Sequence, residues 1–319
     1  MTFFIILFLV IGILSLYKGA DLLVKHSSSL AAKLGISTMA VGLTVITFGT
    51  ILPEFTVAII SSINKANDLI IGNALGTTAF CFGFILGLAA LINPIAIKDS
   101  TLKNQFPWIG LYAVVIYLLA FDLTISRGDG GILLLLGAAF VGYSIYQSRK
   151  ERIEEIGKRA VKRSQKKALK TAFSWIKIIL GILLIIGGAK LLIDSSLAIV
   201  SHLGASELII GIVVIAIGTS LPEFVTMITA SFKDRPAVGI GNVIGGATMN
   251  VFAIVGIASV IDPIKIHPDM LVFDFPAVIF FVILISVLFA SSHKLTRFEG
   301  ALLIAGYIGY LVYSIKFWG

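Results

Sequence analysis

Two short segments with the same pattern contain the residues best suited to bind a cation. Residues 49–54 read Gly-Thr-Ile-Leu-Pro-Glu and residues 218–223 read Gly-Thr-Ser-Leu-Pro-Glu, each inside a stretch otherwise apolar enough to cross a membrane. A proline inside a helix removes one backbone hydrogen bond, and within a bilayer the freed carbonyl needs another partner. A glutamate that faces lipid costs about 2.5 kcal/mol or more. The pattern therefore predicts two interrupted membrane helices that line an oxygen-rich cation site near the bilayer midplane.

The residue types in these segments favour calcium. Calcium takes about six to eight oxygen ligands, and Glu54 and Glu223 offer four carboxylate oxygens and two negative charges. Thr50 and Thr219 lie one helical turn before the glutamates and so share their face. We expect interrupted helices to expose further carbonyls near Thr47, Gly49, Ala216 and Gly218. No His or Cys accompanies the glutamates, which argues against a soft metal. Each glutamate alone could instead be a structural hydrogen-bond acceptor.

A second repeated motif lies downstream of each glutamate. Gly72-Asn73-x-x-Gly76 and Gly241-Asn242-x-x-Gly245 place small residues four apart, which allows close helix contact. The glycines alone could serve packing only. Buried polar side chains without partners are unfavourable in hydrocarbon. We therefore expect most of the nearby polar residues to face the ion site or to orient the two glutamates: Asn73, Thr77, Thr78, Asn242, Thr248 and Asn250.

The composition predicts an integral membrane protein. Of 319 residues, 58% are hydrophobic and 13% charged, against about 25% charged in soluble domains. The net charge of +8 is concentrated in the segment 149–170, which carries ten Lys or Arg and three Glu. The positive-inside rule explains this excess without a nucleic-acid partner, although the segment could also contact anionic lipid. The single cysteine, Cys81, permits no internal disulfide.

Apolar runs predict an all-α fold of ten transmembrane helices. The N-terminal run lacks the basic start and the cleavage site of a signal peptide, so we interpret it as the first helix. The predicted spans are 3–24, 38–63, 69–92, 105–122, 131–148, 174–200, 207–232, 237–261, 270–291 and 298–317.

The two halves of the chain are copies. Residues 42–55 and 211–224 match at nine of fourteen positions, and the offset of 169 that joins Glu54 to Glu223 also joins the two Gly-Asn motifs. Each copy has five predicted spans, so the second must enter the membrane from the opposite side. Such inverted repeats hold substrate sites at their interface. We predict a first five-helix repeat at 1–148, a basic cytoplasmic loop at 149–172 and a second, inverted five-helix repeat at 173–319.

The charges of the loops predict the orientation. With the basic loop in the cytoplasm, both termini lie outside the cell in a multi-pass plasma-membrane protein. The inside loops then carry Lys25, Lys33, Lys98, Lys103, Lys233, Arg235, Lys294 and Arg297. The outside loops carry only Lys65, Arg127 and Lys265.

The paired GT-x-LPE and GN-x-x-G segments, on an inverted five-helix repeat, resemble the two α-repeats of the sodium/calcium exchangers, within the cation/calcium exchanger superfamily. The resemblance covers almost the whole chain. It implies an antiporter rather than an enzyme, with Ca²⁺ and Na⁺ as transported ions and no cofactor. It also implies alternating access by sliding of the first and sixth helices. By the same resemblance, Ca²⁺ binds to Glu54, Glu223, Thr50 and Thr219. Sodium sites use Thr47, Thr50, Glu54 and Thr77 on one side, and Ala216, Thr219, Ser220 and Glu223 on the other.

This sequence departs from the family pattern at four central positions. Ile51 replaces a serine that the second repeat keeps as Ser220, and Gly246 replaces a hydroxyl residue that the first repeat keeps as Thr77. Cys81 and Asn250 replace a central polar pair that is commonly Asn with Asp. We therefore expect one oxygen to be missing from each presumed sodium site. Proton/calcium exchange, which needs fewer oxygens, is the alternative to sodium/calcium exchange.

Two other classes of protein are less consistent with the sequence. An intramembrane hydrolase could use paired glutamates to hold a metal that activates water, but it predicts histidine ligands beside them. The four histidines all fall near predicted helix ends and loops. A passive channel is possible, but glutamates at interrupted helices of inverted repeats suit occluding binding better than rapid conduction.

Overall fold

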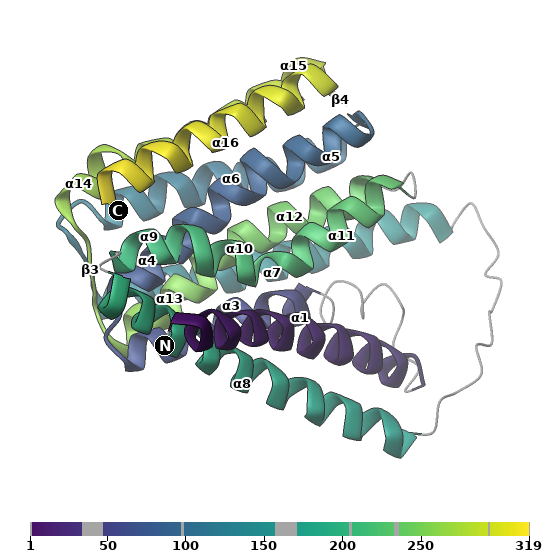
Figure 1. The fold of residues 1–319 in the computed structure, drawn as a ribbon. Coiled ribbons are helices and arrows are strands. Elements are labelled where there is room, and N and C mark those ends of the chain that lie inside the picture. The colour runs from purple at the N-terminus through teal and green to yellow at the C-terminus, as the bar shows by residue number, and fades with distance from the viewer. Residues whose placement is uncertain are drawn as a thin grey trace.

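The computed structural model describes residues 2–33, 47–96, 99–156, 171–203, 206–232, 236–292 and 294–318. These residues form an elongated bundle of helices with two short strand pairs (Figure 1). The first half contains α1 (Thr2–Lys33), α3 (Thr47–Ile63), α4 (Asn67–Ala79), η2 (Phe80–Ile85), α5 (Leu86–Ile92), β1 (Ile95–Ala96), α6 (Asp99–Leu119), β2 (Thr124–Ile125) and α7 (Arg127–Ile156).

The second half repeats this order of elements. It contains α8 (Thr171–Leu203), α9 (Glu207–Ile209), η3 (Ile210–Ile215), α10 (Ala216–Thr219), α11 (Leu221–Phe232), α12 (Pro236–Met249), η4 (Asn250–Val255), α13 (Gly256–Ile261), β3 (Ile264–Lys265), α14 (Pro268–Val272), α15 (Asp274–Ser292), β4 (Lys294–Leu295) and α16 (Arg297–Trp318). Each of the ten spans predicted from the sequence overlaps a described helix or a consecutive stack of helices.

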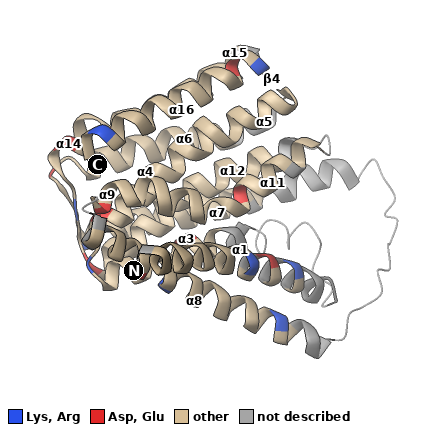
Figure 2. Ribbon diagram, in the orientation of Figure 1, with Lys and Arg blue, Asp and Glu red and all other residues tan. Residues whose placement is uncertain are grey.

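Several described helices are long and apolar enough to cross a bilayer. By length and hydropathy these are Asn67–Ile92, Trp175–Ile199, Gly239–Ile261, Pro268–Ser291 and Arg297–Trp318. A sixth candidate is the pair Glu207–Thr219 and Leu221–Phe232, bent by 47°. Most charged residues that are described lie toward the two ends of the bundle, and its body is largely uncharged (Figure 2). The structure is therefore that of a helical membrane protein.

The two proline motifs differ in backbone structure. In the second half the helix is interrupted at Ser220, and Pro222 lies in the first turn of α11. Backbone N–H groups in the first turn have no partner within the helix, so the missing N–H of proline costs no hydrogen bond there. In the first half α3 continues through Pro53, its seventh residue. The prediction of an interrupted helix at both motifs is thus wrong for the first, where the flanking turns keep helical geometry around the proline.

Of the three π-helical turns in the described residues, η2, η3 and η4, two lie in corresponding positions and carry residues of the central pocket. The segment η2 begins one residue before Cys81, and η4 begins at Asn250. A π turn adds a residue to the helical repeat, rotates the side chains that follow, and often marks a functional site. The two turns occupy corresponding positions of the two halves.

Glycines bring α4 and η3 into close contact. A Cβ on Gly72 would lie 2.7 Å from the carbonyl oxygen of Leu208, and one on Gly211 would lie 3.1 Å from the Cα of Gly72. Neither position has room for a side chain. The close helix contact predicted from the Gly72-Asn73-x-x-Gly76 motif is therefore confirmed.

Two strand pairs tie the halves together. β1 pairs with β4 through Ile95 and Leu295, and β2 pairs with β3 through Ile125 and Ile264. β3 lies at the end of the bundle that bears both chain ends, and β4 lies at the opposite end (Figure 1). Each pair joins one half to the other, so the halves are fastened at both ends of the bundle.

The helices that follow β2 and β4 begin with equivalent caps. The Ser126 amide donates to Asp129 Oδ2 at 2.8 Å, and the Asp129 amide donates to Ser126 Oγ at 3.3 Å. The Thr296 amide donates to Glu299 Oε2 at 2.7 Å, and the Glu299 amide donates to Thr296 Oγ1 at 3.3 Å. Both are reciprocal capping boxes, and they show that the repeat extends into the last helix of each half.

Candidate cation site

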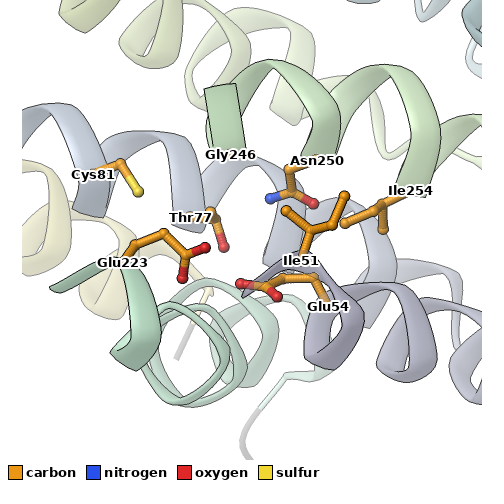
Figure 3. Close-up of a pocket in the computed structure, with 8 residues that line it drawn as sticks. All are labelled: Ile51, Glu54, Thr77, Cys81, Glu223, Gly246, Asn250 and Ile254. Carbon is orange, nitrogen blue, oxygen red and sulfur yellow. The ribbon is translucent and has the colours of Figure 1, made fainter. Parts of the chain in front are cut away.

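A small pocket at the centre of the bundle brings together the two glutamates predicted from the sequence. Figure 3 shows the carboxylates of Glu54 and Glu223 directed into the same space, Glu54 from α3 and Glu223 from α11. They are 2% and 1% exposed. The residues that line the pocket are Ile51, Glu54, Thr77, Cys81, Glu223, Gly246, Asn250 and Ile254.

Local structure aims both carboxylates inward. Glu54 follows Pro53 within a continuous helix, on the same side as the buried Val57 and Ala58 one turn later. Glu223 lies in the first turn of α11, just after the interruption at Ser220. A carboxylate in a helical first turn interacts favourably with the N-terminal end of the helix dipole. Two carboxylates removed from water need compensating positive charge or protons, so this arrangement suits a cation.

Four polar residues beside the carboxylates form one hydrogen-bonded group. Ser220 Oγ donates to Thr77 Oγ1 at 3.3 Å, and Thr77 Oγ1 donates to Asn73 Oδ1 at 3.4 Å. Thr219 Oγ1 lies 3.3 Å from the same Asn73 oxygen and 3.0 Å from the carbonyl of Ile215. All four side chains are buried. We call Asn73, Thr77, Thr219 and Ser220 the hydroxyl flank.

The repeat gives the hydroxyl flank a counterpart, which differs in chemistry. The offset of 169 relates its residues to Asn242, Gly246, Thr50 and Ile51 in turn. Ile51 is buried and lines the pocket beside Glu54 and Ile254 (Figure 3). Gly246 also lines the pocket and has no side chain. We call these four positions the apolar flank. It carries an isoleucine and a glycine where the hydroxyl flank carries a serine and a threonine.

This grouping changes one prediction. The family resemblance places Thr77 and Ser220 in opposite sodium sites, with one oxygen missing from each. In the structure the two hydroxyls are hydrogen-bonded to each other. Because each flank takes residues from both halves, the two departures, Ile51 and Gly246, fall together on one flank and leave the other complete.

The remaining central pair comes from the π turns. Cys81 and Asn250 are related by the same offset and line the pocket, both fully buried. Neither polar atom of the Asn250 amide has a hydrogen-bond partner within the described part of the chain. Figure 3 shows this amide beside Ile51 and facing the carboxylates. A buried amide without partners is unfavourable, and a bound cation would satisfy its oxygen.

The other described residues predicted to belong to the site do not appear among those that line the pocket. The carbonyl of Ala216 accepts the Ser220 amide at 3.2 Å, and Asn242 lies half-buried on α12. Thr78 and Thr248 donate to carbonyls of their own helices, at 3.1 and 2.8 Å. The side chains of Thr47 and Thr50 lie outside the described residues.

Ile254 also lines the pocket, although it was not among the site residues predicted from the sequence, because it is apolar. It lies one helical turn beyond Asn250, and this spacing could have placed it on the same face of the helix.

The fold and the pocket together define a class of protein. The structure is a helical membrane protein with a repeated architecture. Its two halves contribute one carboxylate each to a buried central pocket. Within the described residues, no group of three or more His, Cys, Asp or Glu side chains is placed to hold a metal ion. The class is a membrane transporter with a paired-carboxylate centre.

Comparison with known proteins identifies the family. The family model described as "Sodium/calcium exchanger protein" matches residues 4–146 and 173–316. The chain therefore belongs to the sodium/calcium exchanger family, and the resemblance noted from the sequence is confirmed. The family and fold are those of cation/calcium antiporters.

Curated relatives match along almost their whole length. The inner membrane protein YrbG of Escherichia coli is 32% identical, over 97% of this chain and 96% of the relative. The putative antiporter CaxA of Alkalimonas amylolytica is 29% identical, over 95% and 96%. The sodium/calcium exchanger MaX1 of Methanosarcina acetivorans is 27% identical, over 96% and 97%.

Solved structures of the sodium-calcium exchanger NCX_Mj share the fold. One of them, soaked with Na⁺ and Sr²⁺, superimposes with a TM-score of 0.69 at 26% identity, covering 98% of this chain and 99% of that chain. The ten-helix inverted repeat predicted from the sequence fits this fold.

Proposed function

We propose that this protein is a secondary active antiporter that exchanges calcium for sodium by alternating access at the central pocket. The observation that carries the proposal is the meeting of Glu54 and Glu223, one from each half, in one buried pocket. Two negative charges match one divalent cation, and the same carboxylates can hold sodium once calcium leaves. Entry of one ion then requires departure of the other, which is the condition for exchange.

The proposed ligands come from the motif segments. Calcium would bind to Glu54, Glu223, Thr50 and Thr219, with sodium oxygens from the other positions predicted above. Asn73 would act by positioning, because it accepts from Thr77 and lies 3.3 Å from Thr219. Thr47 and Thr50 enter on the family resemblance and the repeat alone.

Alternating access is proposed to use the pair α1 and α8. These long helices lie side by side at one edge of the bundle (Figure 1), and Gly12 and Gly188 face each other between them. A Cβ on Gly12 would lie 3.0 Å from the carbonyl oxygen of Gly188. Close packing at these glycines would let the pair move as one unit past the rest of the bundle.

Proton/calcium exchange is the second candidate, and one structural observation favours it. Ile51 and Gly246 give one flank of the pocket two fewer side-chain hydroxyls than the other. A centre with fewer oxygens is less suited to several sodium ions, whereas protons need only the carboxylates. The flux experiment below separates the two candidates.

The topology is also part of the proposal. We propose a five-helix repeat at 1–148, a cytoplasmic segment at 149–172 and an inverted five-helix repeat at 173–319, with both termini outside the cell in the plasma membrane. Both chain ends lie at the same end of the bundle, opposite β4 (Figure 1). The loop charges support the direction, and segment 149–170 would contact anionic lipid.

The test is radioactive calcium flux into proteoliposomes under separate sodium, potassium and proton gradients. A sodium gradient should drive uptake in the wild type, and Glu54→Gln and Glu223→Gln should each abolish it. Glu299→Gln is the matched control, because Gln also completes a capping box and Glu299 lies outside the pocket. Uptake driven by protons alone would favour the second candidate. Normal transport by both pocket variants would refute the site.

A further inference from the structure

We propose that this chain exchanges one calcium ion for two monovalent cations, so that a complete cycle moves no net charge. The proposal rests on the antiport function above and adds its stoichiometry. Two independent observations carry it: the chemical difference between the flanks of the pocket, and the number of carboxylates buried around it.

The hydroxyl flank is arranged to accept one monovalent cation. Ser220 donates to Thr77, Thr77 donates to Asn73, and Thr219 has two acceptors within 3.3 Å. Each hydroxyl hydrogen is thus directed at another protein group, which leaves oxygen lone pairs for a cation. Figure 3 shows the Thr77 hydroxyl beside the carboxylates. Hard cations prefer such oxygen ligands.

The apolar flank keeps Asn242 and Thr50 but has two fewer side-chain oxygens than the hydroxyl flank. Its two altered positions, Ile51 and Gly246, supply no side-chain oxygen, and Ile51 is only 4% exposed within the hydrophobic core. A cation placed against that side chain would lose hydration that the isoleucine cannot replace, which is unfavourable. The pocket therefore has one flanking cation position where a fully symmetric repeat would have two.

The number of buried carboxylates sets the total positive charge that the pocket can bind. Among the described residues, the buried carboxylates are Glu54, Glu223 and Asp274. Asp274 lies outside the pocket lining and is satisfied by the Tyr310 hydroxyl at 3.2 Å and Trp318 Nε1 at 3.0 Å. The repeat-related pair Cys81 and Asn250 adds no carboxylate. The pocket thus carries two negative charges.

Charge balance then selects the stoichiometry. A closed pocket with uncompensated charge is unfavourable, so two carboxylates occlude either one calcium ion or two monovalent cations. Of the two monovalent cations, one occupies the hydroxyl flank. The other lies between the carboxylates, next to Asn250, whose amide atoms have no partner in the described part of the chain. The two loads carry equal charge, so the exchange is electrically silent.

The direct test imposes a membrane potential on calcium exchange. Proteoliposomes with a fixed sodium gradient and constant pH receive a potassium diffusion potential through valinomycin, and equilibrium calcium accumulation is measured. We expect no change over 100 mV. A cycle that moves one net charge would change accumulation about 50-fold per 100 mV, which would overturn the proposal while leaving antiport intact. If no cation gradient moves calcium, the proposed function fails as well.

A paired variant tests the flank assignment. Ile51→Ser with Gly246→Ser converts the apolar flank into a chemical copy of the hydroxyl flank. A Cβ at Gly246 would lie 3.6 Å from Glu223 Oε1, an ordinary contact. We expect this variant to take a third monovalent cation and to show a dependence of about 50-fold per 100 mV, whereas Ile51→Val stays voltage-independent. A voltage-independent double variant that still exchanges calcium would overturn the assignment.

A binding measurement keeps the proposal testable if the double variant does not fold. Sodium displaces radioactive calcium from the wild-type protein in detergent, and the Hill coefficient of that displacement reports how many sodium ions replace one calcium ion. We expect a coefficient that approaches two and does not exceed it. A value near three would overturn the proposal.

Discussion

The hydroxyl flank and the apolar flank are related by the repeat, yet they offer a cation different surroundings. Each flank combines one residue that precedes a Leu-Pro-Glu with one that follows a Gly-Asn-x-x-Gly. Ser220 therefore meets Thr77 across the interface, and Ile51 and Gly246 fall together on the other flank. One substitution in each half is therefore enough to take two hydroxyls from one flank and spare the other.

The backbones of the two halves differ at the same place. α3 runs through Pro53, whereas α10 ends before Ser220 and α11 starts afresh. Ser220 at the interruption has φ −83° and ψ 8°, outside helical geometry. Its side chain belongs to the hydroxyl flank, so the interruption and the polar contacts occur on the same side of the pocket.

The largest effect is expected from making both flanks apolar. Thr77→Gly with Ser220→Ile copies Gly246 and Ile51 onto the hydroxyl flank and leaves Asn73 with fewer donors. Losing two buried hydrogen-bonding groups, at about 1–3 kcal/mol each, should reduce sodium-driven calcium uptake at least about 30-fold. Ser286→Ala is the control, since the Ser286 hydroxyl donates to the carbonyl of Val282 within α15 and Ser286 does not line the pocket. Unchanged uptake by the double variant would remove the distinction between the flanks.

A smaller effect is expected at the two prolines. Pro53 lies inside α3, where proline costs about 3 kcal/mol, so Pro53→Ala should raise the melting temperature of the purified protein in detergent. Pro222 lies in the first turn of α11, where proline is tolerated, and Pro222→Ala should change it little. Equal shifts would mean that the two helices do not differ as described.

Glycines in close and in ordinary helix contacts should differ in a similar way. Gly72→Ala would place a Cβ 2.7 Å from the Leu208 carbonyl oxygen, and forcing the helices apart costs about 1–3 kcal/mol. A Cβ on Gly306 would instead lie 3.5 Å from Phe281 Cε1, an ordinary contact, so Gly306→Ala is the control. Thermal unfolding in detergent should therefore show a lower melting temperature for Gly72→Ala only. A comparable loss for Gly306→Ala would mean that the close approach at Gly72 is not the cause of the effect.

The smallest difference is expected at the helix caps. Asp129→Ala and Glu299→Ala each remove one side of a capping box, and each should destabilise the protein by about 1 kcal/mol. The two melting temperatures should agree, because the caps are equivalent in the two halves. A clear difference would show that the asymmetry extends beyond the pocket.

Much of the fold and the pair of glutamates followed from the sequence. Hydropathy identified the spans, because a bilayer demands long apolar helices. The constant offset joined Glu54 to Glu223, and the structure brings both into one pocket. Both predictions use only the local composition and the internal repeat, and both of these can be read from one sequence without knowledge of the fold.

What the sequence could not supply was contact between the halves. It assigned Thr77 and Ser220 to separate sites, because nothing along the chain shows that the hydroxyls meet across the interface. It also predicted an interruption at Pro53, where the surrounding turns keep the helix intact. The π turns that carry Cys81 and Asn250 have no local signature, so their inward orientation emerged only from packing.

The strand pairs have a consequence for how such a molecule could arise. β1 pairs only with β4 and β2 only with β3 among the described strands, so each strand pair forms between the halves and not within one. Two separate polypeptides, each resembling one half and inserted into the bilayer in opposite orientations, would associate through the same two strand pairs. Two fragments expressed from a gene split between the halves would then reassemble through these strand pairs. An ancestor built from two identical subunits would already have had both strand pairs.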